Sequence, residues 1–323
     1  MCGIFGYIGN KSAADRIING LKRLEYRGYD SWGIAVLNED KIDVTKQVGA
    51  IGKLSEENWP ESHIGVGHTR WATHGGVTKV NAHPHYSTDK SFVLAQNGIV
   101  ENYQELKEEL KNKGYKFISE TDTEVIVRLV EEKLKQIQDL KEAARQAFLD
   151  LEGRNTIIIL SAGETEKNKE RQVIAIRNGS PLVVGVKENE YFFASDTLSF
   201  ADKTNKVIFV NDFEMVEYNG EKINLYKAKT GKEIEYTIQE INHTEAKIDK
   251  EGFDHFMLKE IVEQKDAIRN AIQYSKKELN PLLEVIEEAD TIYTVGAGTA
   301  SYEAAQAANL LREVAGKKVT ELK

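Results

Sequence analysis

The stretch from residue 155 to residue 241 consists almost entirely of strand-length apolar segments, and this restricts the first part of the chain to a sheet-based fold. The dipeptides Asn178-Gly179 and Asn219-Gly220 fall between such segments and predict hairpin turns. The predicted strands cover residues 156–160, 173–177, 182–186, 191–195, 206–210, 215–218 and 222–226.

Helical patterns precede this stretch, together with further strands. Residues 2–8 predict a strand, and Ser12 with Asp15 forms a capping box for the helix that follows. Charged helices are expected over 103–113 and, with a break, over 121–151. Strands are also predicted at 33–48 (a hairpin around 38–40), 64–70 and 91–96. Sheets between helices place this part of the chain in the α+β class.

The pattern changes near residue 240, where a polar, charged segment begins. One helix is predicted over 253–274. Its expected buried face consists of Phe256, Leu258, Ile261, Val262, Ile268 and Ile272. A strand at 291–295, a glycine loop and a helix are typical of the opening of a parallel α/β domain.

A single strand cannot bury both faces of a parallel sheet, so this second domain is expected to be cut short. We assign residues 2–240 to the first domain, 241–275 to a linker and helix, and 276–323 to the second domain.

Charge and composition exclude several functions. The chain has 43 Lys and Arg against 52 Asp and Glu, a net charge of −9, which argues against binding to a nucleic-acid backbone. No apolar run could span a membrane and no signal peptide is recognisable, so we expect a cytoplasmic protein. The single cysteine excludes an intrachain disulfide. His83-Pro84-His85 is the only close histidine pair, and we predict no metal site.

Cys2 is a candidate nucleophile because of its position in the chain. If Met1 is removed, the α-amine of Cys2, with a pKa of about 7.7–8.0, lies beside the thiol and can serve as its base. The alternative is that Cys2 is a small buried hydrophobe in a strand.

Residues 68–75 and 96–102 are dense in groups that recognise or polarise a substrate. Arg70 can bind a carboxylate, Asn97 with the Gly98 N–H can form an oxyanion hole, and Asp122 can hold an ammonium group. Each also has a structural explanation: a surface salt bridge for Arg70, a turn for Asn97-Gly98 and a helix cap for Asp122.

The motifs at 2–7, 24–31, 68–75, 97–102 and 119–124 resemble, in this order, the class II glutamine amidotransferase domain. Residues 25–31 and 252–261 more closely resemble the glutamine–fructose-6-phosphate aminotransferase family, and the likeness spans nearly the whole chain. This resemblance implies an N-terminal-nucleophile glutaminase of αββα build followed by the beginning of a sugar isomerase (SIS) domain.

The resemblance also implies residue roles. Cys2 would attack the side-chain amide of L-glutamine with its own α-amine as base, while Asn97 and Gly98 hold the oxyanion. Arg70 would bind the substrate carboxylate and Asp122 its ammonium group. The pocket would be completed by Trp71, Thr73 and His74, and Arg27 would link site closure to the sugar domain.

In the complete family protein, the ammonia would convert D-fructose 6-phosphate into D-glucosamine 6-phosphate, without a metal or organic cofactor. Gly298, Thr299 and Ser301 match its sugar-phosphate loop, although Ala297 and Ala300 depart from the usual motif. In the glutaminase part, Gln96 replaces a histidine that is common before Asn-Gly. The resemblance implies a homodimer when the SIS domains are complete. From charge and composition we expect no nucleic acid or membrane partner. This chain alone is expected to perform only the glutaminase half-reaction.

Two other functions stay open. The glutaminase could supply another class II enzyme, such as a phosphoribosyl pyrophosphate amidotransferase. The chain could also be an inert module that binds a sugar phosphate or dimerises. Intact Cys2, Arg70, Asn97, Gly98 and Asp122 argue against the inert module.

Overall fold

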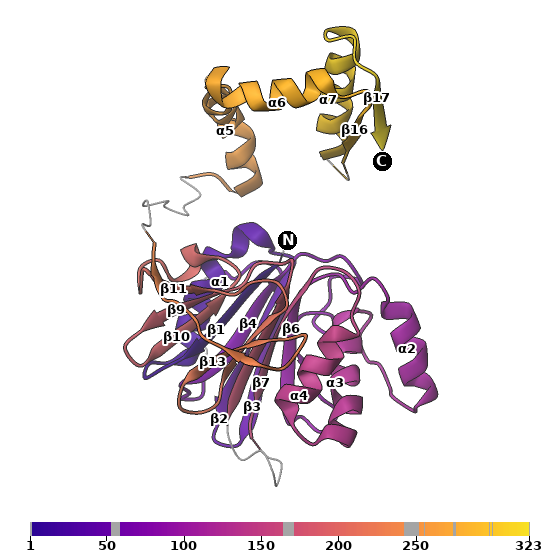
Figure 1. Ribbon diagram of the computed structural model, residues 1–323. Coiled ribbons are helices and arrows are strands. Elements are labelled where there is room, and N and C mark those ends of the chain that lie inside the picture. Colours follow the sequence, from indigo (N-terminus) through magenta and orange to yellow (C-terminus); the bar gives the residue numbers. More distant parts are fainter. Residues whose placement is uncertain are drawn as a thin grey trace. The chain divides into compact units, whose positions relative to one another are not determined.

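A computed structural model describes residues 2–52, 59–163, 171–241, 252–254, 256–273, 276–296, 298 and 300–322 (Figure 1). The chain divides into two units, Met1–Asp249 and Lys250–Lys323. Within the described ranges no helix is both long and apolar enough to cross a membrane.

The first unit contains an eight-stranded sheet and a seven-stranded sheet, and their strand pairings are antiparallel. The eight-stranded sheet is built from β1 Gly3–Ile8, β2 Ser31–Asn38, β3 Lys41–Val48, β4 Ile64–Arg70, β9 Val183–Lys187, β10 Glu190–Ala194, β11 Lys206–Phe209 and β15 Gln239–Glu240. Its order is β15-β11-β9-β10-β1-β4-β2-β3. The N-terminal strand therefore lies in its interior.

The second polar motif, residues 96–102, begins in the seven-stranded sheet. It is built from β5 His85–Tyr86, β6 Phe92–Gly98, β7 Asn155–Ser161, β8 Gln172–Asn178, β12 Glu214–Tyr218, β13 Ile223–Lys227 and β14 Glu233–Ile234. Its order is β14-β13-β12-β8-β7-β6-β5.

Helices cover the outer faces of both sheets (Figure 1). They are α1 Ala13–Arg23, α2 Tyr103–Asn112, α3 Thr123–Ile137 and α4 Leu140–Leu149, with 3-10 turns at Glu25–Arg27 and Thr197–Phe200. Helix α1 packs on the eight-stranded sheet, and the other three pack on the seven-stranded sheet. The resulting αββα sandwich confirms the predicted fold class.

Side-chain alternation along β1 shows how the sequence builds these layers. Ile4 and Ile8 belong to the apolar cluster between the sheets, whereas Phe5 and Tyr7 belong to the cluster beneath α1. A Cβ at Gly67 of β4 would collide with Ile17 of α1, so the glycine permits close packing of helix on sheet.

The structure confirms the local signals near the N-terminus. Ser12 accepts a hydrogen bond from the backbone N–H of Asp15 and caps α1. Strands β2 and β3 form the hairpin predicted around residues 38–40, and β12 and β13 form the one predicted at Asn219-Gly220.

The predicted hairpin at Asn178-Gly179 is wrong. Gly179 has a positive φ of 83°, as a turn requires. However, β8 pairs with β7 and β12, whereas β9 pairs with β10 and β11. The turn therefore carries the chain from one sheet to the other, because the strand order of the sandwich overrides the local turn signal.

The second unit is a small α/β arrangement. It comprises α5 Phe256–Ala271, α6 Lys276–Glu288, β16 Ile292–Val295, α7 Ala300–Glu313 and β17 Val319–Leu322. Strands β16 and β17 pair in parallel. The sequence predicted β16 and α7 but not the second strand, β17.

The face of α5 that was expected to be buried is exposed. Leu258 is 44% exposed, Ile261 56% and Ile272 74%. Val262 and Ile268 are exposed as well, and nothing is described of the Phe256 side chain. A two-stranded sheet is too small to cover this helix together with its neighbours, so the apolar periodicity does not lead to burial within the described residues.

Candidate active site

Cys2 lies at the start of β1, where three segments of the first unit meet. The register between β1 and β4 pairs Gly3 with Thr69, and this brings Cys2 to the end of β4. The Trp71 N–H donates to Cys2 Sγ at 3.3 Å. The carbonyl oxygen of Cys2 accepts from Asn97 Nδ2 at 3.1 Å and from Arg27 Nε at 3.0 Å.

The surroundings of Cys2 act on its thiol in opposite directions. Burial raises the pKa of the Cys2 thiol, while the hydrogen bond with Trp71 and the positive charge of Arg70 lower it, leaving a net increase. The thiol therefore stays protonated near neutral pH and needs a base to become a nucleophile.

Asn97 and Gly98 end strand β6 and do not form a plain turn, since they pair with Thr156 and Asn155 of β7. Gly98 has φ of 123°, and a Cβ there would collide with the carbonyl oxygen of Arg154. Only glycine fits this position.

His68, His83 and His85 form a row of buried rings beside Asn97. Ring centroids are 4.3 Å apart between His68 and His83, and 5.0 Å apart between His83 and His85. Burial lowers the pKa of His68 to about 3 and lowers the pKa values of His83 and His85 well below the usual range. All three imidazoles are therefore neutral.

Gln96 is held by a closed set of hydrogen bonds. Its backbone N–H donates to His83 Nδ1 at 3.5 Å, and its Oε1 accepts from Thr123 Oγ1 at 2.6 Å. His83 Nε2 lies 3.0 Å from the same Thr123 oxygen, and Gln96 Nε2 donates to Asn155 at 2.7 Å. The amide thus finds a partner at each end.

Arg70 is the last residue of β4 and is only 3% exposed, so it is not a surface salt-bridge residue. Its Nη1 donates to Gly76 O at 3.1 Å, and its Nη2 donates to Gly75 O at 3.1 Å and to His74 O. A guanidinium has five N–H donors, so some are left for a ligand. The loop after β4 fixes the guanidinium by its own carbonyl groups.

Asp122 directly precedes α3, yet its side chain does not cap that helix. Asp122 Oδ2 accepts the Val100 N–H at 2.9 Å instead. Burial raises the pKa of Asp122, against the lowering effect of the Val100 hydrogen bond and of His74. A cation bound at this carboxylate would stabilise its charged form.

One narrow pocket brings most of the predicted residues together. It is lined by Cys2, Arg70, Trp71, Thr73, His74, Gly98 and Asp122, and also by His83, Gln96 and Thr121. Asn97 and Arg27 reach the same site through the Cys2 carbonyl group. The Trp71 ring, 39% exposed, packs edge-on against Tyr29 at 5.9 Å.

Sequence reasoning missed His83 and Thr121 as lining residues. His83 was considered only as half of a metal-binding pair, and Thr121 lies inside a motif in which Asp122 drew attention. No local pattern indicates the ring stack, because it depends on contacts between β4, β5 and the start of α3.

The residues matched to a sugar-phosphate loop lie in the second unit. Gly298 has φ of 59°, and Ser301 Oγ donates to Gly298 O at 2.7 Å. Thr299 lies outside the described residues.

Two other features of the first unit bear on the choice of site. A groove of about 860 Å³ runs past Tyr86, Tyr115 and Leu134, but none of its lining residues contacts Cys2. In the part of the chain that the structure describes, no group of three or more His, Cys, Asp or Glu side chains is placed to bind a metal ion. The converging polar groups make the narrow pocket the candidate site.

Comparisons with known proteins agree with this geometry. A family model described as a glutamine amidotransferase domain matches residues 42–235. The chain is 44% identical over 322 residues to a glutamine–fructose-6-phosphate aminotransferase [isomerizing] of Thermococcus kodakarensis, covering 99% of this chain and 52% of the relative. A protein of the same name from Thermus thermophilus is 39% identical over 323 residues, with 98% and 52% covered. The chain spans about half the length of these relatives.

Solved structures give the same fold. A structure described as the allosteric regulatory enzyme of purine biosynthesis matches with a TM-score of 0.63 and 25% identity, covering 71% of this chain and 49% of the other. The glutamine phosphoribosylpyrophosphate amidotransferase of B. subtilis matches with a TM-score of 0.63 and 21% identity, covering 99% and 65%. Since the family model covers more than half of the chain, the resemblance found in the sequence motifs is confirmed, and the chain belongs to the glutamine amidotransferase domain family.

Proposed function

We propose that this chain hydrolyses L-glutamine to L-glutamate and ammonia, with Cys2 as an N-terminal nucleophile. The observation that carries the proposal is the position of Cys2, which meets the Trp71 N–H at its sulfur and the Asn97 amide at its carbonyl oxygen. The proposed nucleophile and the proposed oxyanion donor are therefore in direct contact, as acyl transfer requires.

Removal of Met1 would free the α-amine of Cys2 to act as base. The thiol proton passes to this amine while Sγ bonds to the amide carbon. The C–N bond then breaks, and the proton leaves with ammonia. Water hydrolyses the thioester, which releases glutamate and restores the thiol. Because burial raises the thiol pKa, the amine is needed to generate the thiolate.

Asn97 has two N–H groups on Nδ2, one of which donates to the Cys2 carbonyl oxygen. We assign the other, with the Gly98 N–H, to the oxyanion. Arg70 and Asp122 would bind the carboxylate and ammonium of glutamine, and Thr73, His74 and Trp71 would close the pocket around them. One fixed charge of each sign suits a zwitterionic amino acid.

In the complete protein, the ammonia would aminate D-fructose 6-phosphate. The names of the 39–44% identical relatives support this acceptor over phosphoribosyl pyrophosphate, since the amidotransferases of solved structure are only 21–25% identical. We further propose that Gly298, Thr299 and Ser301 belong to the sugar-phosphate site, that Arg27 links closure of the glutamine site to the sugar domain, and that the complete protein is a homodimer.

Measuring glutamate release and sugar amination separately tests the proposal. The wild-type chain should release glutamate and form no D-glucosamine 6-phosphate by itself. Cys2→Ala, and a form that retains Met1, should release none. A diazo-ketone analogue of glutamine should add mass to the peptide that begins at Cys2. Glutamate release by the Cys2→Ala chain would contradict the nucleophile assignment, and an inert wild-type chain would favour a binding module.

A further inference from the structure

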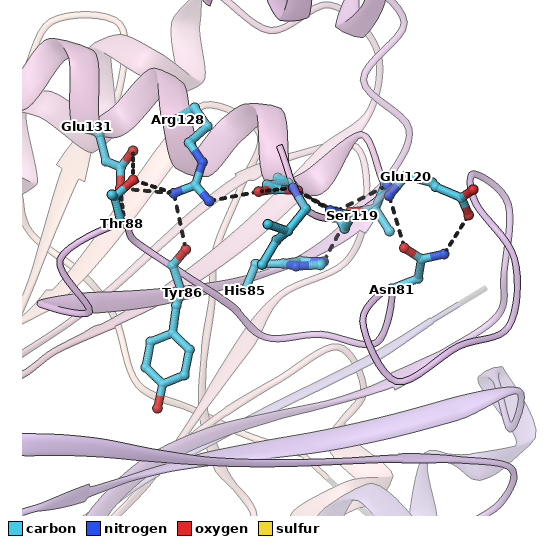
Figure 2. Close-up of polar contacts among 11 residues, drawn as sticks. Asn81, His85, Tyr86, Thr88, Ser119, Glu120, Arg128 and Glu131 are labelled. Atoms are coloured by element: carbon cyan, nitrogen blue, oxygen red, sulfur yellow. Dashed lines mark hydrogen bonds and ion pairs between the residues drawn. The ribbon is translucent and has the colours of Figure 1, made fainter. Parts of the chain in front are cut away.

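Two loops that lie far apart in the sequence carry the groups proposed to bind the ends of glutamine. The loop after β4 fixes Arg70 through its carbonyl groups, and the segment before α3 ends at Asp122. Asn81 belongs to the first of these loops and Glu120 to the second, and the two side chains face one another (Figure 2).

Asn81 and Glu120 form a hydrogen-bonded bridge between the two loops. Asn81 is 2% exposed and uses both ends of its amide in this bridge. Its Nδ2 donates to Gly76 O at 2.9 Å and to Glu120 Oε2 at 2.9 Å. Its Oδ1 accepts the backbone N–H of Glu120 at 3.0 Å. The Gly76 N–H also donates to Glu120 Oε2, at 3.1 Å. Three of these hydrogen bonds join the two loops, and the fourth, from Asn81 to Gly76, braces the loop after β4.

The bridge includes Gly76, the residue whose carbonyl oxygen also accepts a hydrogen bond from Arg70. Gly76 O accepts from Arg70 Nη1 at 3.1 Å as well as from Asn81, and Gly76 N is held by Glu120. A shift of Gly76 would move the guanidinium with it. Hydrogen bonds from Asn81 and Gly76 lower the pKa of Glu120, so this carboxylate stays charged and keeps accepting them near neutral pH.

The other side of the bridge is anchored in α3. The Glu124 carboxylate accepts from the Ser119 N–H at 2.6 Å and from Ser119 Oγ at 2.7 Å, and it pairs with Arg128 at 2.7 Å. Figure 2 shows this chain of contacts continuing from Ser119 to Arg128, Thr88 and Glu131. Residues 119–122 are thereby fixed to the helix, and Asn81 ties the Arg70 loop to them.

We propose that Asn81 and Glu120 are positioning residues that set the separation between Arg70 and Asp122, and so determine selectivity for an amino acid with both a free carboxylate and a free ammonium group. The inference rests on the proposed glutaminase function. Neither residue lines the pocket, so both act through the groups that do.

Steady-state kinetics of the full chain, with the variants Asn81→Ala and Glu120→Ala, test the proposal. Loss of the bridge should raise KM for glutamine roughly tenfold and change kcat by less than about twofold, because binding of the substrate ends is lost equally in ground and transition states. Glu120→Gln keeps an acceptor oxygen and should fall between wild type and Glu120→Ala. Being a substitution at an exposed position, it also leaves the core unaffected.

Inhibition by one-ended analogues gives a readout that a general loss of stability would not produce. Glutaramate lacks the α-ammonium group, and 4-aminobutanamide lacks the α-carboxylate. Wild type should prefer glutamine over both, and the preference should shrink roughly tenfold in Asn81→Ala. Glu131→Gln is the matched control, because Glu131 belongs to the same network but contacts Arg128 and Thr88 rather than the Arg70 loop.

An unchanged KM in both alanine variants, or the same change in Glu131→Gln, would overturn the bridge proposal while wild-type turnover still supports the glutaminase. A wild-type chain freed of Met1 that does not release glutamate would instead contradict the proposed function itself. A fall in kcat at constant KM would assign the bridge to chemistry rather than to substrate selectivity, and this too would overturn the proposal.

Discussion

His68 contacts the end of the Asn97 amide that points away from Cys2, with Nε2 at 3.1 Å from Asn97 Oδ1. The same ring nitrogen lies 3.0 Å from Gln96 O. Both neighbours are carbonyl oxygens, so Nε2 carries the proton and donates. This fixes which end of the Asn97 amide faces Cys2, because a flipped amide would oppose two N–H groups. The tautomer of a buried histidine thus orients the proposed oxyanion donor.

Loss of this contact should slow the chemistry without weakening substrate binding. We expect His68→Leu to lower kcat by roughly 10–100-fold at nearly constant KM, and Asn97→Ala by about 100–1000-fold. The double variant should be no slower than Asn97→Ala, since both changes remove one oriented amide. Stopped assays of glutamate release measure these effects. Additive losses in the double variant would show that His68 acts independently of Asn97.

The three neutral histidines should make stability fall in mild acid. Their folded pKa values lie below the unfolded value of about 6.5, so below that pH only the unfolded state takes up protons. Burial is the first cause, and the positive charges of Arg70 and Lys46 add to it. His68, with a folded pKa of about 3, should lower the free energy of unfolding by up to about 1.4 kcal/mol per pH unit between pH 6 and 4, and His83 and His85 should add to this loss.

Urea denaturation at pH 7.0, 6.0 and 5.0 measures this slope. Removing one of the three, as in His85→Gln, should reduce the slope. His63→Gln is the control, because it removes an exposed histidine that lies outside the ring row. Equal slopes for wild type and His85→Gln would mean that His85 is protonated in the folded chain.

Asp122 should make glutamine binding sensitive to acid at a higher pH than an ordinary aspartate would. Burial raises its pKa, so the carboxylate is protonated, and its pairing with the substrate ammonium lost, as the pH falls through that raised value. KM for glutamine should therefore rise as the pH is lowered. Asp122→Asn should raise KM about 10–100-fold and remove this pH dependence.

Initial rates at several pH values, taken where unfolding is negligible, check this expectation. Asp150→Asn provides the matched control, since Asp150 is exposed and pairs with Lys133 away from the pocket. A KM that follows pH in the same way in wild type and Asp122→Asn would assign the titration to another group.

The sequence predicted those features that depend on local patterns. The capping box at Ser12, the hairpin at Asn219-Gly220 and the strand over residues 2–8 each depend on a few neighbouring residues, and all were confirmed. Cys2, Arg70, Asn97 and Asp122 could be chosen because their motifs follow a family order. The pairing of β1 with β4 brings Cys2 and Arg70 together, Asp122 lines the same pocket, and Asn97 reaches it through the Cys2 carbonyl group.

The features that the sequence did not predict depend on contacts between distant elements. Asn178-Gly179 has the composition of a hairpin, but the strand order of two sheets decides its connection. His83 and His85 looked like a poor metal pair, and only the position of β4 turns them into a ring stack. The Asn81–Glu120 bridge spans 39 residues of chain and leaves no periodic signal.

The Glu124–Arg128 pair should be the most stabilising ion pair of the α3 segment, because both side chains are buried. Glu124 is 1% exposed and Arg128 6%. Burial acts to raise the pKa of Glu124, but hydrogen bonds from Ser119 and Ile118 and the pairing with Arg128 outweigh it and leave the pKa lowered. The carboxylate is therefore charged near neutral pH, and removing the arginine leaves an uncompensated buried charge.

We expect Arg128→Met to lower the free energy of unfolding by about 3–5 kcal/mol. Adding Glu124→Gln should recover part of this loss, because the unpaired charge is removed while Ser119 keeps an acceptor. Urea denaturation at pH 7 gives the three values, with Glu131→Gln as the control for the outer, less buried contact of Arg128. If the double variant were as unstable as the sum of its single changes, the loss would come from the packing of the arginine stem rather than from the buried charge.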